Sequence, residues 1–226
     1  MRITEMHITP IALGDPPLLN AAGLHAPYCL RTVVELRTAD GLTGLAEVPG
    51  SAAVDAALAR PDLDASRTAL MGGSFGGYMA NWVAGHTDRF AALINHAGVN
   101  DFITQFGADI TSFGFSNVLG GRPWENPEGM QRNNPTTYAR NFRTPMLIIH
   151  GEKDYRVPYA NGTALYGIYQ AMGLPSRLVI FPDENHWILS PQNSIYWNWE
   201  VQSWLARWIG GQPTLEKPVF GAADTK

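Results

Sequence analysis

Cysteine is almost absent from this sequence, since Cys29 is the single one among 226 residues. One cysteine cannot form a disulfide within the chain, which excludes a disulfide-stabilised secreted fold and fits a reducing compartment. Long hydrophobic runs are absent too, because no stretch of 18 apolar residues occurs and the amino-terminal "MRITEMHITP" lacks the apolar core of a signal peptide. We therefore expect a cytoplasmic protein that is neither exported nor inserted in a membrane.

Positive charge is also scarce. The sequence has 16 Lys and Arg residues against 20 Asp and Glu, a net charge of −4, and no basic cluster that could neutralise a phosphate backbone. A nucleic-acid partner is therefore not expected. Hydrophobic residues make up 45% and charged residues 16% of the chain, which indicates a packed globular protein rather than a disordered one.

The first 51 residues have the pattern of antiparallel strands. In "YCLRTVVELRT" apolar residues alternate with charged ones, and a turn at Asp40-Gly41 leads into "LTGLAEV". With "ITEMHITPIAL" ahead of this hairpin, the segment is predicted to be a three-stranded β-meander. Such a small sheet needs a surface against which its apolar face can pack.

From about Leu58 the pattern changes to short apolar runs separated by helical stretches. The runs are "TALMG", "AALINHAGV", "TPMLIIHG" and "SRLVIFP". Continuously apolar strands that alternate with helices predict a parallel sheet covered on both faces, which is an α/β fold. The last predicted helix has Ser190 as its N-cap and Pro191 in its first turn, carries an apolar stripe rich in tryptophan, and ends at Gly210-Gly211.

The segment "GGSFGGY" lies between the first apolar run and a helix predicted from Tyr78 to about Gly85. It matches G-x-S-x-G, in which a serine sits on a sharp strand-to-helix turn with its hydroxyl exposed at the end of the sheet. The turn forces the serine into a strained backbone conformation, and side chains at the neighbouring glycine positions are expected to collide with the strand or the helix. Ser74 is therefore a candidate nucleophile.

A serine nucleophile needs a base and a carboxylate that orients the base, and on such a sheet both follow later strands in the order acid, then histidine. "HGEKDYRVP" after the third run contains Asp154 and the nearer Glu152, and "DENHW" after the fourth contains His186 and Asp183. Asp183 lies so close to His186 that a loop-structuring role is expected. Order along the chain leaves both Asp154 and Glu152 as candidates.

Two further histidines, His96 and His150, lie nearer the strand interiors. We expect them to be hydrogen-bonded core residues rather than bases. No metal-ligand set or cofactor motif is assigned.

From about Leu58 to Gly211 the chain resembles the catalytic domain of the prolyl oligopeptidase family of serine peptidases, acylaminoacyl peptidases especially. The resemblance is carried by "RPDLDASRTALMGGSFGGYMANW", "NPTTYARNFRTPMLIIHGEKDYRVP" and "LVIFPDENHWI". It implies a truncated α/β-hydrolase sheet, Ser74 as nucleophile, Asp154 rather than Glu152 as the orienting acid, and His186 as base. It also implies that the Phe75 N–H is one oxyanion donor.

The resemblance implies further site features. Arg156 looks like part of the family's motif, in contact with substrate or in a structural pair. Members of the family carry an "HGG"-type loop that provides a second oxyanion donor, and no such motif precedes Ser74. We therefore expect esters, or short acyl-peptides, to be hydrolysed and esters to be preferred. Four phenylalanines are candidates for a substrate pocket: Phe102, Phe106, Phe113 and Phe115.

The first 51 residues instead resemble the amino-terminal capping segment of a glucarate dehydratase-type member of the enolase superfamily. In that family the positions that match Asn20 and His25 touch substrate, but no catalytic barrel follows here. We interpret the chain as a chimera with a β-meander at 1–55, a hydrolase part at 56–212 and a tail at 213–226. The alternative functions are an inactive fusion product and a sugar-acid binding module.

The strand that ends at Gly72 is expected to present an open edge, because nothing before it in the hydrolase-like part can pair with it. A strand of the meander or the same edge of a second subunit could cover it. The second arrangement predicts a homo-oligomer.

Overall fold

The computed structural model describes residues 3–14, 19–20, 23–24, 28–39, 43–49, 67–109 and 119–219. The chain divides into two compact units, Met1–Leu63 and Asp64–Lys226. The predicted boundary between residues 55 and 56 lies outside the described residues, and so do His25, Phe113 and Phe115.

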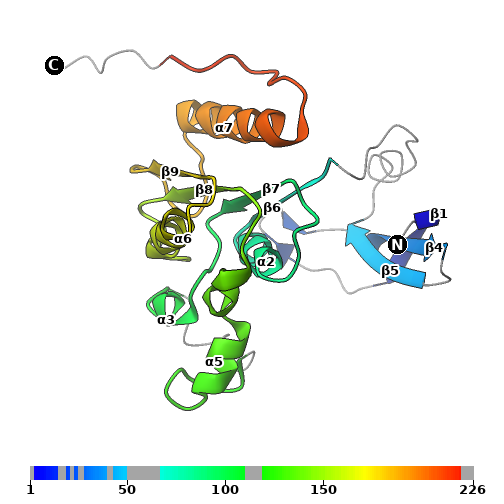
Figure 1. Ribbon diagram of the computed structural model, residues 1–226, viewed down its shortest axis with the longest axis horizontal. Coiled ribbons are helices and arrows are strands. Elements are labelled where there is room, and N and C mark those ends of the chain that lie inside the picture. Colours follow the sequence, from blue (N-terminus) through cyan, green and yellow to red (C-terminus); the bar gives the residue numbers. More distant parts are fainter. Residues whose placement is uncertain are drawn as a thin grey trace. The chain divides into compact units, whose positions relative to one another are not determined.

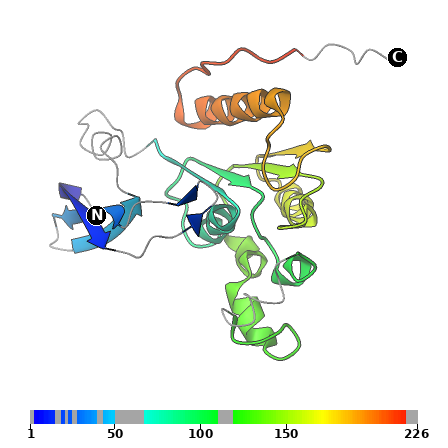
Figure 2. The same cartoon turned by 180° about the vertical axis from the view of Figure 1, so that it is seen from behind.

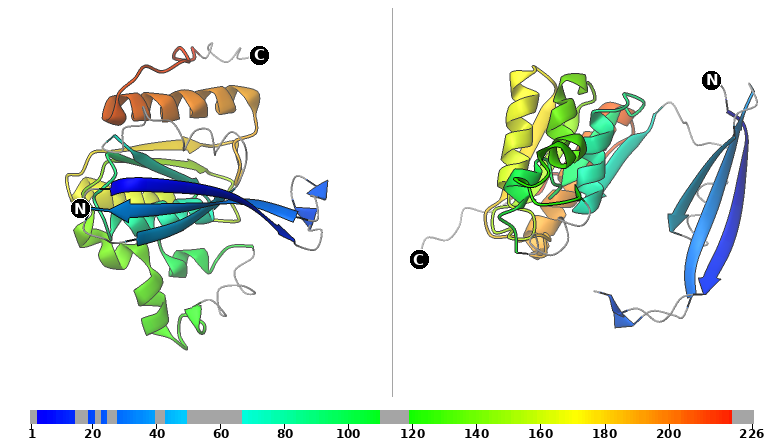
Figure 3. Two further views of the ribbon diagram at one scale, coloured as in Figure 1. Left: turned by 90° about the vertical axis from the view of Figure 1, so that its right-hand side faces the viewer. Right: turned by 90° about the horizontal axis from the view of Figure 1, so that it is seen from below.

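The first unit contains an antiparallel sheet of three strands in the order β1-β4-β5, which Figure 3 shows as a curved ribbon. The strands are β1 (Ile3–Gly14), β4 (Tyr28–Thr38) and β5 (Thr43–Pro49). The predicted meander is therefore confirmed. A short pair, β2 (Leu19–Asn20) and β3 (Gly23–Leu24), lies between β1 and β4 in the chain, and the Asn20 side chain lies outside the described structure.

The second unit is built on a parallel sheet of four strands in the order β6-β7-β8-β9. The strands coincide with the four apolar runs: β6 (Ala69–Gly73), β7 (Ala92–His96), β8 (Met146–Gly151) and β9 (Ser176–Phe181). Every residue of the two central strands, β7 and β8, is buried. This is the burial expected for a parallel sheet with both faces covered.

Helices cover both faces of this sheet (Figure 1), and Figure 2 shows the same layers from behind. One face carries α7 (Pro191–Ile209), and the other carries α2 (Phe75–Ala84) and α6 (Ala160–Ala171). Short helical segments connect these elements: α3 (Phe102–Gln105), α5 (Pro127–Asn133) and the 3₁₀ segment η1 (Pro135–Asn141). The predicted α/β-hydrolase sheet flanked by helices is confirmed.

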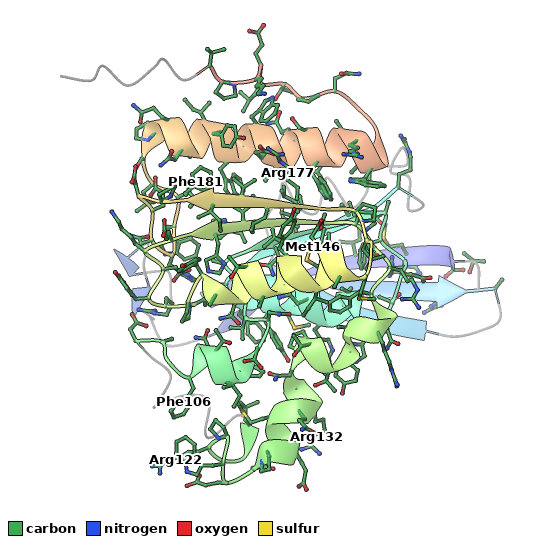
Figure 4. All side chains as sticks on the ribbon, turned by 60° about the vertical axis from the view of Figure 1, so that its left-hand side comes forward. Phe106, Arg122, Arg132, Met146, Arg177 and Phe181 are labelled. Carbon is green, nitrogen blue, oxygen red and sulfur yellow. The ribbon has the colours of Figure 1, made fainter. Side chains whose placement is uncertain are left out.

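Two hydrophobic clusters fill the layers on the two sides of the sheet. On the α7 side, Phe181 packs with Val201 and Trp204, and Figure 4 shows Phe181 between β9 and that helix. On the opposite side, Met146 and Phe142 pack against Leu165 and Tyr169 of α6. The sheet therefore has a rigid core beneath the loops at its carboxyl edge.

The strand β6 lies at one end of the sheet order and, among the described residues, pairs only with β7. Met71 in this strand is 48% exposed, so the edge presents apolar surface. The sequence predicts that a strand of the meander or a second subunit pairs with this edge. This pairing, and the homo-oligomer that the second arrangement implies, stay predictions. In the part of the chain that the structure describes, no helix is long and apolar enough to cross a membrane.

Candidate active site

Ser74 occupies the turn between β6 and α2, at the carboxyl edge of the sheet. Its backbone has φ 57° and ψ −117°, a left-handed conformation that residues other than glycine rarely adopt. The turn is held by two backbone bonds, because the Ser74 N–H donates to the carbonyl of His96 (2.9 Å) and its carbonyl accepts from the Tyr78 N–H (3.0 Å). The expected strained backbone at the serine is confirmed, and such strain is typical of functional turns.

The helix after Ser74 begins at Phe75, earlier than the predicted start at Tyr78. Gly76 and Gly77 lie in the first turn of α2, which comes close to neighbouring backbone. A Cβ on Gly72 would stand 2.3 Å from the Gly76 backbone, and one on Gly77 would stand 2.6 Å from Gly98. The expected collision therefore occurs at Gly72 but not at Gly76, whose own Cβ would meet no atom within 4 Å.

Replacement of Gly72 by alanine is expected to destabilise the fold by about 1 to 3 kcal/mol, because the new methyl group must push the turn away from the strand. The matched control is Gly73→Ala, since a Cβ there meets nothing closer than 3.9 Å. Urea unfolding of the two variants measures the difference. Equal midpoints would contradict a close approach of Gly72 to α2.

Asp154 and His186 come from the loops after β8 and β9, which lie at the same edge of the sheet as Ser74. Asp154 Oδ2 lies 2.8 Å from His186 Nδ1, and the carboxylate is buried while the imidazole is partly exposed. The two loops are joined by a bond from the Lys153 N–H to the Glu184 carbonyl (2.9 Å). The rival acids, Glu152 and Asp183, are both exposed.

The Asp154 carboxylate accepts hydrogen bonds on both oxygens. Oδ1 accepts from the backbone N–H groups of Arg156 and Val157, each at 2.9 Å. Oδ2 accepts from His186 and also lies 3.2 Å from His150 Nε2. Burial by itself raises the pKa of Asp154, but the hydrogen bonds from both histidines and from Val157 outweigh it and hold the pKa well below its ordinary value. Asp154 is therefore ionised at neutral pH.

His150 is fully buried, as expected for a hydrogen-bonded core histidine. Its Nε2 lies 2.8 Å from the Val157 carbonyl and faces the Asp154 carboxylate, so both neighbours of this nitrogen are acceptors. The proton therefore sits on Nε2. His150 gives the carboxylate a second imidazole donor, which sequence order did not reveal.

The ionised Asp154 also fixes the tautomer of His186. An acceptor at Nδ1 places the proton on that nitrogen and leaves Nε2 free to accept a proton. The Ser74 hydroxyl makes no hydrogen bond with the residues that the structure describes, and serine–base contacts are often long without substrate. Phe75 is the first residue of α2, so its N–H has no acceptor within the helix and can serve an oxyanion.

Glu184, two positions before His186, ties the histidine loop to the start of α7. Its buried carboxylate accepts from the backbone N–H groups of Leu189 (3.0 Å) and Ser190 (2.9 Å) and from the Asn193 side chain (2.8 Å). The helix starts at Pro191 as predicted, but the Ser190 side chain makes no capping bond to it. Burial raises the pKa of Glu184, yet these hydrogen bonds outweigh it and lower the pKa to about 2.

Glu184→Gln is expected to destabilise the protein by about 1 to 3 kcal/mol at pH 7, because an amide cannot accept all three bonds. The folded-state pKa is below the ordinary value of 4.5, so the carboxylate stabilises the fold above pH 4.5, and this contribution is lost as the pH falls towards 2. Thermal unfolding of both proteins between these pH values measures the effect. The two curves should converge at the acidic end, and a constant difference would contradict the assignment.

Two of the phenylalanines proposed for a pocket, Phe102 and Phe106, lie in the described part of the chain, and they make different contacts. Phe102 is 6% exposed in a cluster with Val99 and Met130, whereas Phe106 packs edge-on against Trp124 at 5.3 Å, at the lower end of the view in Figure 4. Arg156 pairs with Asp109 at 2.7 Å on the surface.

A pocket of about 340 Å³ lies beside the glycines of the turn and is lined in part by His96, Trp187 and Trp197. These residues lie on the α7 side of β6 and β7. Among the described residues, no group of His, Cys, Asp and Glu side chains could hold a metal ion.

Comparison with known proteins gives a match between residues 50–212 and the prolyl oligopeptidase family. Dipeptidyl-peptidase 5 of Schizosaccharomyces pombe is 40% identical over 144 residues, 63% of this chain and 21% of that protein. Dipeptidyl-peptidase 5 of Porphyromonas gingivalis is 39% identical over 163 residues, 70% of this chain and 24% of that protein. The chain thus spans about a fifth to a quarter of the length of these relatives.

Among solved structures, the acylaminoacyl peptidase of Pyrococcus horikoshii matches with a TM-score of 0.65 and 27% identity. The match covers 73% of this chain and 28% of that one. The family match begins at residue 50, so the resemblance of the preceding segment to a dehydratase, and the chimera inferred from it, stay predictions.

Proposed function

Because the chain belongs to the prolyl oligopeptidase family, we propose that it is a serine hydrolase in which Ser74 is the nucleophile, His186 the base and Asp154 the orienting acid. The observation that carries this proposal is the 2.8 Å bond between Asp154 and His186, made at the sheet edge where the strained turn holds Ser74. All three residues belong to the second unit.

In the proposed reaction, Ser74 Oγ forms a bond to the carbonyl carbon of the substrate while its proton passes to His186 Nε2. The carbonyl π-electrons move to oxygen, and the Phe75 N–H stabilises the resulting oxyanion at the start of α2. Asp154, ionised and hydrogen-bonded, stabilises the imidazolium. The tetrahedral intermediate then collapses, the leaving group takes the proton from Nε2, and an acyl group remains on Ser74. Water, deprotonated by the same nitrogen, then forms a bond to the acyl carbon. The bond to Ser74 Oγ breaks, Nε2 returns the proton to Oγ, and the acid is released.

We further propose that the substrates are esters or short acyl-peptides. The relatives are named dipeptidyl-peptidases and acylaminoacyl peptidase, and we propose peptide cleavage from that similarity. Phe75 supplies one oxyanion donor, and no "HGG" motif precedes Ser74 in this sequence. An activated ester requires less stabilisation of the oxyanion than an amide does, because its leaving group departs more readily.

The experiment compares p-nitrophenyl esters with p-nitroanilides of the same acyl group, so that only the leaving group differs. We expect the ester kcat/KM to exceed the anilide value by a factor on the order of 10² or more, which is the scale of the rate that one oxyanion donor contributes. Equal values would overturn the ester preference. Hydrolysis of neither substrate would overturn the proposed activity.

A further inference from the structure

One residue contacts the backbone of both the proposed nucleophile and the proposed base. His96 ends β7 and is 8% exposed. Its carbonyl accepts the Ser74 N–H at 2.9 Å, and its side-chain Nε2 lies 3.2 Å from the carbonyl oxygen of His186. Among the described residues, this contact is the one hydrogen bond made by the backbone of His186.

The direction of the second bond is set by a tryptophan on α7. Trp197 Nε1 lies 2.8 Å from His96 Nδ1, and an indole N–H can only donate, so Nδ1 must be the acceptor. The ring proton therefore sits on Nε2, from which it is donated to the His186 carbonyl. Burial lowers the pKa of His96, although the bond to His186 opposes this shift, and the neutral ring suits both contacts.

Ring contacts reinforce the same arrangement. Trp187 stacks over His96 with ring centroids 6.4 Å apart, and it meets the His186 ring edge-on at 4.9 Å. Trp197 also meets the His96 ring edge-on at 5.8 Å. The histidine loop is therefore connected to the sheet through His96 and to α7 through Trp197.

We propose that His96, oriented by Trp197, is a positioning residue that sets the location of His186 relative to Ser74. The proposal rests on the proposed function, since it assigns the two residues that His96 links as base and nucleophile. Without the N–H of His96 Nε2, the backbone carbonyl of His186 loses its hydrogen bond. The Nε2 atom of His186 then moves away from Ser74 Oγ. A misplacement of about 1 Å can cost on the order of 10² in rate.

Three variants separate the donor from the packing. His96→Gln keeps a side-chain N–H at a similar distance from Cβ, His96→Leu removes the donor, and Trp197→Phe keeps an aromatic ring without the indole N–H. The matched control is Trp204→Phe. Trp204 lies on the same helix, is 5% exposed, and its indole N–H has no hydrogen-bond partner among the described residues.

The first measurement is the rate at which a fluorophosphonate modifies Ser74, together with kcat and KM for a p-nitrophenyl ester. His96→Leu and Trp197→Phe are expected to lower the labelling rate and kcat roughly 10- to 100-fold, with KM within about twofold of the original value. His96→Gln should recover most of the rate. In Trp204→Phe, Ser74 should be labelled at the original rate, even if the melting temperature of this variant falls as far as that of Trp197→Phe.

The second measurement does not need activity. The His186 Nδ1–H that donates to Asp154 should give a far-downfield proton resonance, which is expected to broaden through faster exchange in His96→Leu and Trp197→Phe but not in Trp204→Phe. The proposal requires both slower labelling of Ser74 and a broadened resonance in His96→Leu. Labelling at the original rate, or an unaltered resonance, in this variant therefore overturns the proposal. If that variant does not fold, Trp197→Phe decides in its place. If the unmodified protein is not labelled at all, the proposed function fails and the resonance alone decides the positioning role.

Discussion

Replacement of Ser74 by alanine is expected to lower kcat for a p-nitrophenyl ester by about 10⁴-fold or more, which is the scale seen when a triad nucleophile is removed. The physical reason is that Ser74 is the proposed site of the acyl intermediate and that the base of the Asp154–His186 pair acts on its hydroxyl. The variant should fold normally, because alanine removes one partly exposed hydroxyl and leaves the backbone bonds of the turn in place.

The control for this change is Ser203→Ala, since Ser203 lies on α7 away from the proposed nucleophile. Initial rates and melting temperatures of both variants should be measured on the same preparations. Turnover that persists at the original rate in Ser74→Ala would remove the basis of the proposed mechanism, whereas an equal loss in Ser203→Ala would point to a stability effect.

Replacement of Asp154 by asparagine is expected to lower kcat by about 10⁴-fold, although the residue need not touch the substrate. Both oxygens of the Asp154 carboxylate face N–H groups of other residues: two backbone donors at Oδ1, and the imidazoles of His186 and His150 at Oδ2. An amide has only one acceptor oxygen, so its NH₂ must face one of these pairs of donors. If it faces His186, the imidazole changes tautomer and Nε2 can no longer accept the serine proton.

The matched controls for Asp154→Asn are Glu152→Gln and Asp183→Asn, because both acids lie in the same two loops and are exposed. They should retain kcat within about threefold, as most exposed substitutions away from a site do. Unfolding curves should accompany the kinetics. N–H donors that face the NH₂ group of the new asparagine lose their acceptor, and this loss also lowers the stability of the fold. A larger loss of kcat in Glu152→Gln than in Asp154→Asn would reverse the assignment of the acid.

Much of the second unit could be predicted from local patterns. Apolar runs identify β6 to β9. The signal is strongest in β7 and β8, where every residue is buried, because a strand covered on both faces favours apolar residues. The turn at Ser74 could be predicted because a strand, a glycine cluster and a helix follow one another within a short stretch. The sequence places the start of α2 too late because glycines normally weaken a helix, whereas here Gly77 lets the helix approach the backbone at Gly98.

Contacts between distant segments could not be read from the sequence. His96, Trp197 and Glu184 act through bonds that exist only once β7, α7 and the histidine loop are packed together. Trp197 lies in an apolar stripe that is equally consistent with simple core packing, and only its indole N–H distinguishes it from Trp204. Likewise, "HGEKD" contains His150, but the sequence does not state that its ring turns towards Asp154.

The most direct test of the central claim is to treat the protein with a fluorophosphonate and to locate the adduct by peptide mass spectrometry. We expect one adduct per chain, on Ser74, and its loss when His186 is replaced by alanine, because the hydroxyl reacts only with the base in place. An unmodified protein, or an adduct on another serine that persists without His186, would contradict it.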